Sequence, residues 1–170
     1  ADVFEHRHNL AVETSSPGTN RVLAVHTLMY ANNIWGYTYS SSRYFAFDFW
    51  VGQTNGVNRT NLAEFDLATG LMTAWDPGLN RAQVRALAVN GNTLYAGGLI
   101  TSAGGQARRR IAAFDLTTGL VTPWDPNITG TAKVETIVPA GNTIYIAGRF
   151  PTVRGLNPTN LVAVDATTAA

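Results

Sequence analysis

The chain has 170 residues, of which 45% are hydrophobic and 14% charged, and its twelve Lys and Arg side chains are nearly balanced by eleven Asp and Glu. This composition predicts a folded domain, because disorder needs low hydrophobicity and high charge, and the net charge of +1 gives no field to steer nucleic acid or an anionic membrane. The chain has no cysteine, which excludes disulfides, thiolate catalysis and cysteine metal sites, and no apolar run of the roughly 18 residues that a membrane-spanning helix requires.

The N-terminal segment, residues 1–20, contains one strand-like run, NLAVET at 9–14, followed by the turn-forming run SSPGTN. We expect this strand to be able to complete a sheet that lacks one. His6 and His8 would lie on one face of an extended segment, a spacing that suits a transition metal. We expect an ordinary terminal segment there, without a metal site.

The stretch IWGYTYSSSRYFAFDFW, residues 34–50, predicts an aromatic hairpin. From Val25 to Asp66 is 41 residues, whereas Val89 to Asp115 is 26, so we interpret this hairpin as inserted or elongated relative to the later units. Ordinary strand packing is one interpretation of it. The other is an exposed platform for a sugar or a protein partner, since Tyr and Trp offer large contact area with a polar end. The candidate surface residues are Trp35, Tyr37, Tyr39, Phe45, Phe47 and Phe49.

Two further hairpins share one design. Apolar runs flank Asn90-Gly91-Asn92, and a later pair flanks Ala140-Gly141-Asn142. Asn-Gly is a strong hairpin signal because both residues tolerate positive φ. In the unit that contains the first of these turns, we predict strands at 84–89, 93–98, 110–115 and 120–124.

One sixteen-residue motif occurs twice in the sequence. AEFDLATGLMTAWDPG, which begins at residue 63, recurs as AAFDLTTGLVTPWDPN, so that Asp66 and Asp115 lie 49 residues apart, and Asp165 follows 50 residues later. A period near 50 with four strand-like runs per unit is typical of β-propeller blades. The sequence therefore predicts an all-β fold of about three four-stranded, propeller-type blades, the last of them incomplete.

The predicted organisation follows from this period. The segment 1–20 with its blade-closing strand precedes a first blade at 21–79 with the aromatic insertion, a second blade at 80–129 and an incomplete third blade at 130–170. Three units are fewer than the four or more blades that close a propeller ring. We therefore expect self-association, or another chain that supplies the missing blades, and two copies would give six.

The recurring residues are assigned to the scaffold. The Asp can accept hydrogen bonds from backbone N–H groups two or three residues on, and the Gly of the turn supplies positive φ. The Trp is expected to wedge between neighbouring blades. A catalytic role for the aspartates is the alternative, but a catalytic site needs one set of residues and these recur in each unit. The scaffold residues are Asp66, Gly70, Trp75, Asp115, Gly119, Trp124 and Asp165.

The stretch VRALAVNGNTLYAGGLITSAGGQARRRIAAFDLTTGLVTPWDP resembles the delta-60-type β-propeller repeat of bacterial extracellular and surface proteins. The resemblance covers residues 80–170, and 50–79 in part. It implies a propeller, secretion or surface display in bacteria, and no established catalytic residues. The Asp-x-x-Thr-Gly and Trp are also similar to the docking motif of quinoprotein propellers, but Trp124 lies five residues after Gly119 instead of the usual four. The Cys pair and metal ligands of that family have no counterpart, so we infer no quinone cofactor.

Arg108-Arg109-Arg110 is the basic run of the sequence that could contact phosphate or sulfate. The equivalent positions in the other units are not basic runs. We therefore expect a solvated loop at this point.

The expected function is a non-catalytic, secreted or cell-surface module that binds a protein or glycan partner, or assembles with another chain. We expect no cofactor, no nucleic acid and no membrane span. No phosphate-binding loop, Gly-x-Ser-x-Gly or His-Glu-x-x-His motif occurs in the sequence. The alternatives are a structural subunit of an extracellular filament or coat, and a glycan-acting enzyme.

Overall fold

The computed structural model is all-β, with thirteen strands and no helix within the part of the chain that it describes. The side chains are described for residue 43 and from residue 61 onward. The described residues are 36–40, 43–47, 52–54, 57–59, 61–66, 68–69, 71–79, 83–130, 132–158 and 160–170. Outside them lie the predicted N-terminal strand at 9–14, His6, His8, Trp35, Phe49 and Gly70.

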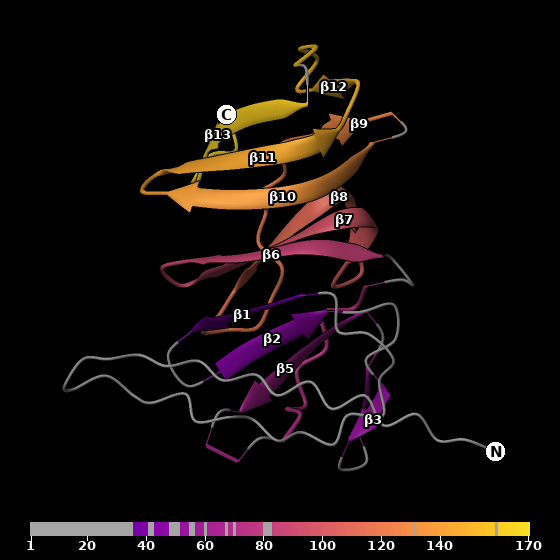
Figure 1. Ribbon diagram of the computed structural model, residues 1–170, viewed down its shortest axis with the longest axis vertical. Coiled ribbons are helices and arrows are strands. Elements are labelled where there is room, and N and C mark those ends of the chain that lie inside the picture. Colours follow the sequence, from indigo (N-terminus) through magenta and orange to yellow (C-terminus); the bar gives the residue numbers. More distant parts are fainter. Residues whose placement is uncertain are drawn as a thin grey trace.

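Three antiparallel sheets of three strands each form the body of the structure (Figure 1). The first sheet is β1 (Gly36–Ser40), β2 (Arg43–Phe47) and β5 (Leu62–Asp66). The second is β6 (Val84–Asn90), β7 (Thr93–Ala103) and β8 (Gln106–Asp115), and the third is β10 (Lys133–Ala140), β11 (Thr143–Arg149) and β13 (Leu161–Asp165). Two small ribbons complete the strands: β3 (Gly52–Thr54) with β4 (Val57–Arg59), and β9 (Ile128–Thr129) with β12 (Thr152–Val153).

The register repeats from sheet to sheet. The residue that opens the second strand of each sheet pairs with the recurring Asp that ends the third strand, and these pairs are Arg43 with Asp66, Thr93 with Asp115, and Thr143 with Asp165. The aromatic hairpin therefore occupies the positions of the repeat's own first two strands. Its interpretation as an insertion is wrong, because the register matches position 39, and not Val25, to Val89.

The fourth strand expected at 120–124 is reduced to an isolated bridge between Phe114 and Val121. The N–H of Thr122 still bonds to the third strand, at 2.8 Å from the carbonyl of Ala113. Beyond it the ladder stops, because the N–H of Trp124, which would make the next ladder bond, donates instead to the Thr122 hydroxyl at 3.4 Å. The chain leaves the sheet edge at this point and crosses to the next unit.

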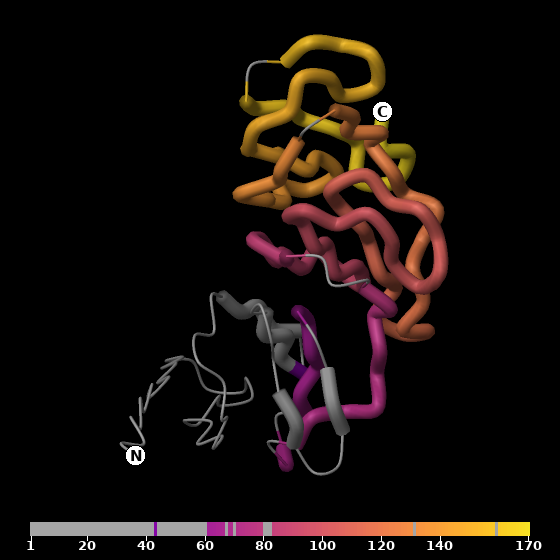
Figure 2. The backbone as a smooth tube through the Cα atoms, turned by 90° about the vertical axis from the view of Figure 1, so that its right-hand side faces the viewer, coloured from indigo at the N-terminus to yellow at the C-terminus, as the bar shows by residue number. Residues whose placement is uncertain are grey.

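The three sheets stack face to face in chain order (Figures 1 and 2). The first strand of each sheet lies against the first strand of the next, β1 against β6 and β6 against β10, and β8 is farthest from the third sheet. Side chains alternate across each strand, so both faces of the second sheet are buried. The layer between the first and second sheets includes Leu62, Leu94, Ala96, Ala112 and Phe114. The layer between the second and third sheets includes Ala88, Tyr95, Ile111, Val134, Ile144 and Ile146.

The crossing segments tie consecutive units together. After Trp75-Asp76-Pro77 the chain runs beside the second sheet, where the N–H of Gly104 donates to the carbonyl of Pro77 at 2.8 Å. The following link forms β9, which pairs with β12 of the third unit. Each link thus supplies backbone partners to the unit that follows it.

Candidate functional site

The recurring Asp closes its turn by accepting backbone hydrogen bonds. Oδ1 of Asp115 accepts the N–H of Thr117 at 2.9 Å and that of Thr118 at 2.7 Å, and the Thr118 hydroxyl donates to it at 3.1 Å. Gly119 completes the turn at a φ of 72°. Asp66 and Asp165 accept the corresponding bonds from their own turns. The aspartates are therefore engaged in the turns, as expected of scaffold residues.

These hydrogen bonds set the charge state of the turns. In the folded chain they lower the pKa of Asp66, Asp115 and Asp165 below the ordinary value of 3.8, and in each case the largest cause is a backbone N–H of the Thr three residues on. A hydrogen bond to the ionised carboxylate favours the ionised form. The folded chain consequently binds fewer protons than the unfolded chain on entering the acidic range.

We expect the free energy of unfolding to fall on acidification. Because the folded pKa values are depressed, this contribution is complete above the unfolded value of 3.8 and is lost as the pH falls through the lower folded values. The measurement is the urea midpoint at pH 7 and at pH 3, in the wild type and in Asp115→Asn/Asp165→Asn. The double variant should lose less stability between the two pH values, and an equal loss in both proteins would contradict the assignment.

The recurring Trp reaches from the end of one unit to the turn of the next. Nε1 of Trp75 donates to the carbonyl of Gly119 at 2.8 Å, and Nε1 of Trp124 donates to the carbonyl of Asp165 at 3.0 Å. The Trp124 ring also lies edge-on to Tyr95, with centroids 5.0 Å apart. Both indoles therefore join consecutive units by one hydrogen bond and by packing.

The aromatic hairpin does not gather its predicted surface residues on one face. Position 37 pairs with 46 and position 39 pairs with 44, whereas position 47 pairs with Leu62. Residues that pair across strands share a face of the sheet, and residues alternate between faces along each strand. Positions 45 and 47 therefore lie on the face of the first sheet opposite to that of 37 and 39. Leu62 belongs to the layer against the second sheet. Positions 45 and 47 are thus on the packing face, while 37 and 39 are on the opposite one. Trp35 and Phe49 lie outside the described residues.

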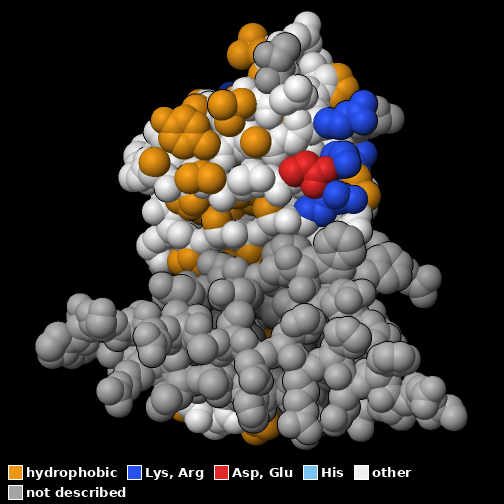
Figure 3. Space-filling model, viewed as in Figure 1, with side chains coloured by type: hydrophobic (Ala, Val, Ile, Leu, Met, Phe, Trp, Pro, Cys, Tyr) orange, Lys and Arg blue, Asp and Glu red, His pale blue; other side chains and the backbone are white. Residues whose placement is uncertain are grey.

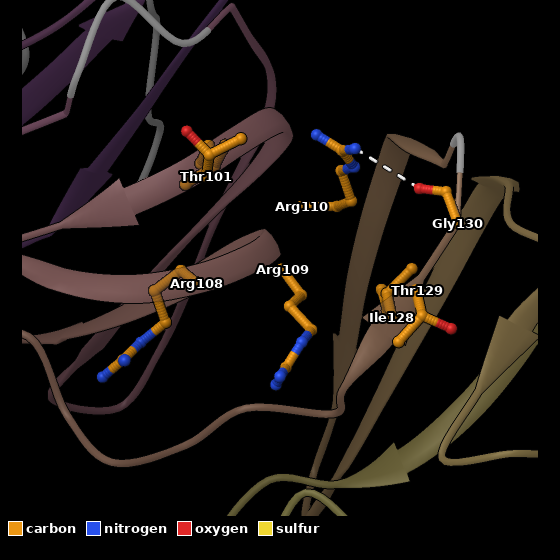
Figure 4. A pocket seen from close by; sticks show the side chains of 8 residues that line it. Thr101, Arg108, Arg109, Arg110, Ile128, Thr129 and Gly130 are labelled. Carbon is orange, nitrogen blue, oxygen red and sulfur yellow. Dashed lines mark hydrogen bonds between the residues drawn. The ribbon is translucent and has the colours of Figure 1, made fainter.

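The basic run is not a solvated loop, because it lies within β8 and its three arginines differ (Figure 4). Arg108 is buried and donates to the carbonyls of Ala107 and Thr122 and to the side chain of Gln106. Arg109 is exposed and lies 3.6 Å from a carboxylate oxygen of Asp125. In Figure 4 the Arg110 side chain turns the other way, toward Gly130, whose carbonyl accepts its bond at 3.3 Å. A hollow of about 240 Å³ lies between these arginines and β9.

A second hollow, of about 400 Å³, opens beside Arg110 at the edge where the second and third sheets meet. We call it the cationic hollow; its lining residues are Leu99, Arg110, Ala132, Lys133 and Arg149. Lys133 opens β10 and stands directly opposite Arg149 of β11. Figure 3 shows Lys and Arg side chains around an acidic one at one edge of the described surface.

Glu135 is the acidic neighbour of Lys133 and Arg85. Its carboxylate lies 2.7 Å from Nζ of Lys133 and 2.9 Å from Nη1 of Arg85, a residue of the second sheet. These bonds, with that from Lys133 the largest, lower the pKa of Glu135 below its ordinary value of 4.5. Glu135 is therefore ionised near neutral pH and offsets part of the positive charge of Lys133 and Arg85.

One polar group in the core was missed by sequence reasoning. The Glu64 side chain is 6% exposed, accepts the Thr73 hydroxyl at 2.8 Å and lies 2.9 Å from Nη1 of Arg43. Arg43 also donates to the carbonyl of Leu116 in the second unit. The sequence does distinguish this residue, because Glu64 aligns with Ala113 and Ala163 and places a carboxylate at a position that is apolar in the other two units.

Within the described residues, no group of three or more His, Cys, Asp and Glu side chains is placed to hold a metal ion. The same part of the chain has no helix of the length and apolarity needed to cross a membrane.

The chain was compared with known proteins. No family model matches it, and no curated protein matches it. Among solved structures it is similar to the computationally designed Ika8 protein, with a TM-score of 0.52 and 12% identity over 82% of this chain. The chain spans 35% of the length of that protein. At this identity the likeness concerns the fold alone, and it agrees with the all-β class.

Proposed function

We propose that the chain is a β-propeller segment with a non-catalytic role in binding and assembly, secreted or displayed at a cell surface. The repeated register, the stacking through first strands and the Trp that joins consecutive units support the propeller. The resemblance to bacterial extracellular repeats supports the location. For the assembly role we propose one partner, a second copy of this chain.

The observation that carries the proposal is the outward face of the third sheet. Val138, Tyr145 and Leu161 are 51%, 42% and 58% exposed there. Their counterparts in the second sheet, Ala88, Tyr95 and Ile111, are at most 7% exposed, because the third sheet covers them. Figure 3 shows apolar side chains gathered over the third sheet, away from its charged edge.

The occupant is argued from the interface already present in the chain. In the second sheet the equivalent face binds a three-stranded sheet with an aliphatic surface, contributed by residues such as Ile137, Ile144 and Ile146. The exposed face repeats the same strand register, with Val138 opposite Tyr145 and Tyr145 opposite Ala163. A sheet of the same repeat is therefore the partner whose shape and chemistry this face fits, and a second copy carries such sheets.

We expect the wild-type chain to self-associate and Leu161→Glu to dissociate it. A carboxylate buried at the interface without a partner opposes association, so the dissociation constant should rise about tenfold or more. The measurement is the mass in solution by light scattering across a concentration series. Circular dichroism establishes that the variant is folded.

Leu120→Glu is the matched control. Leu120 is 68% exposed, but it lies after the Asp115 turn and not on the outward face of the third sheet. It should leave association unchanged. A wild-type chain that stays monomeric throughout the series would refute the assembly role, and equal effects of the two variants would refute the assigned face.

The same assay addresses the structural-subunit alternative. A closed assembly reaches a limiting mass, whereas an open-ended filament keeps growing with concentration. The exposed face supports either mode of assembly, and the limiting mass decides between them.

A further inference from the structure

The cationic hollow departs from the repeat at each of its charged positions. Counting by the period of 49 or 50, Lys133 stands where the second unit has Gln83, and Arg149 stands where it has Leu99. Arg110 stands where the first and third units have Asn61 and Asn160. Cationic side chains thus occur, where the second and third units meet, at three positions that are neutral in the units compared. Repeat architecture alone does not require them.

Arg110 occupies a backbone conformation that disfavours it. Its φ is 71°, and the equivalent Asn61 and Asn160 have φ of 70° and 68°. Left-handed backbone is strained for residues with a Cβ, and Asn is among the side chains that tolerate it best. The other two units use Asn at this position, so the second unit carries Arg against its backbone preference. Strained backbone of this kind clusters at functional sites.

The pair Lys133 and Arg149 adds a second unfavourable arrangement. Like charges directly opposite one another on neighbouring strands are destabilising. Glu135 offsets Lys133, but within the described residues no ion pair or side-chain hydrogen bond involves Arg149. Among the residues that the structure describes, the Arg110 side chain makes one long hydrogen bond, of 3.3 Å, to the carbonyl of Gly130. The hollow therefore holds positive charge that the described residues do not neutralise.

We propose that the cationic hollow binds a sulfate or carboxylate group of an acidic glycan, an inference that rests on the binding role proposed above. Two arginines and one lysine line the space, and guanidinium forks match planar and tetrahedral oxyanions through paired hydrogen bonds. Leu99 and Ala132 supply an apolar wall for the C–H face of a sugar ring. A volume of about 400 Å³ lies within the range of small-molecule sites.

A glycan fits these observations better than a nucleic acid does. Single-stranded nucleic acids are held by bases stacked on aromatic rings, and the described lining of the hollow contains none. The net charge of +1 also offers little attraction to a long phosphate backbone. The charge of this site is local, as recognition of one acidic sugar requires.

The test replaces Arg110 and Arg149 by the residues found at the equivalent positions of other units. Arg110→Asn introduces the residue that the first and third units carry, and Arg149→Leu introduces that of the second unit. Binding is measured by calorimetry with a heparin-type sulfated oligosaccharide and with an oligogalacturonate, which distinguish sulfate from carboxylate as the bound group. Inorganic sulfate probes the group alone, and a neutral oligosaccharide of equal length probes the sugar alone. We expect each substitution to weaken the acidic ligand about tenfold or more.

Arg109→Asn is the matched control. It removes the same charge one residue away, from a side chain that lies outside the cationic hollow and beside Asp125. It should change affinity little. Equal weakening by Arg109→Asn would overturn the site, since only overall charge would then matter. Unchanged binding by Arg110→Asn, no binding of either acidic oligosaccharide, or tighter binding of a single-stranded oligonucleotide would overturn it as well.

The outcome is independent of the assembly test. If neither acidic oligosaccharide binds while Leu161→Glu still dissociates the chain, the glycan site is refuted and the assembly role stands. If the acidic oligosaccharide binds and the chain is monomeric at every concentration, the assembly role is refuted and the site stands.

Discussion

Trp124→Ala is expected to lower the free energy of unfolding by about 3–5 kcal/mol, the usual cost of truncating a buried large aromatic side chain. The Trp124 side chain is 6% exposed and packs edge-on against Tyr95. Burial of roughly 200 Å² at about 25 cal/mol per Å² sets an upper bound near 5 kcal/mol for its hydrophobic contribution. The loss should be visible as a lower midpoint in urea or thermal unfolding.

Trp124→Phe separates packing from hydrogen bonding. Phe retains much of the buried ring but cannot donate to the carbonyl of Asp165, which accepts the indole N–H at 3.0 Å. A carbonyl left without its donor costs about 1–3 kcal/mol. The Phe variant should therefore lie between the wild type and Trp124→Ala. Unchanged midpoints in the Ala variant would contradict the joining role assigned to this residue.

Arg43→Met is expected to destabilise the chain by about 3 kcal/mol at neutral pH. The substitution leaves the Glu64 carboxylate, 6% exposed, with the Thr73 hydroxyl but without its cation. Breaking a buried ion pair costs roughly 3–5 kcal/mol, and the lower end applies because the Arg43 side chain is 32% exposed. Equilibrium unfolding in urea measures the difference.

Glu64→Ala in the Arg43→Met background should recover most of this loss. Ala is the residue that the other units carry at this position, in Ala113 and Ala163, and it removes the buried charge that Arg43→Met leaves unpaired. A double variant no more stable than Arg43→Met would show that the loss came from the packing of the Arg43 stem or from its bond to Leu116.

The all-β class and the period could be predicted because they rest on local chemistry. In the Asp-x-x-Thr-Gly turn, backbone N–H groups donate to the Asp side chain within the same five residues, as the bonds at Asp115 show. Apolar similarity does not align the first unit correctly, because it matches Val25 to Val89, whereas the backbone register matches Tyr39 to Val89. The first unit has the aromatic Tyr39 where the second has the aliphatic Val89, so similarity of residue type does not identify the period there, whereas the backbone register does.

The fourth strand and the candidate site depend on information that a strand pattern does not carry. Residues 120–124 have the composition of a strand, but the Thr122 hydroxyl accepts the N–H of Trp124 and the ladder ends there. The cationic hollow joins Arg110 to Lys133 and Arg149, which only the stacking of two sheets brings together. Of the three arginines in the basic run, Arg110 lines the hollow, whereas Arg108 and Arg109 have other partners.

The links that cross from one unit to the next have a consequence for how the chain loses its structure. Because the carbonyl of Pro77 accepts the N–H of Gly104, and β9 pairs with β12, the second and third units each receive backbone hydrogen bonds from the link that precedes them. Stability is then shared as a nearest-neighbour coupling, in the manner of a one-dimensional chain of interacting elements. Unfolding of one unit therefore destabilises the adjacent unit. The segments that connect the units thus also make unfolding of the stack cooperative.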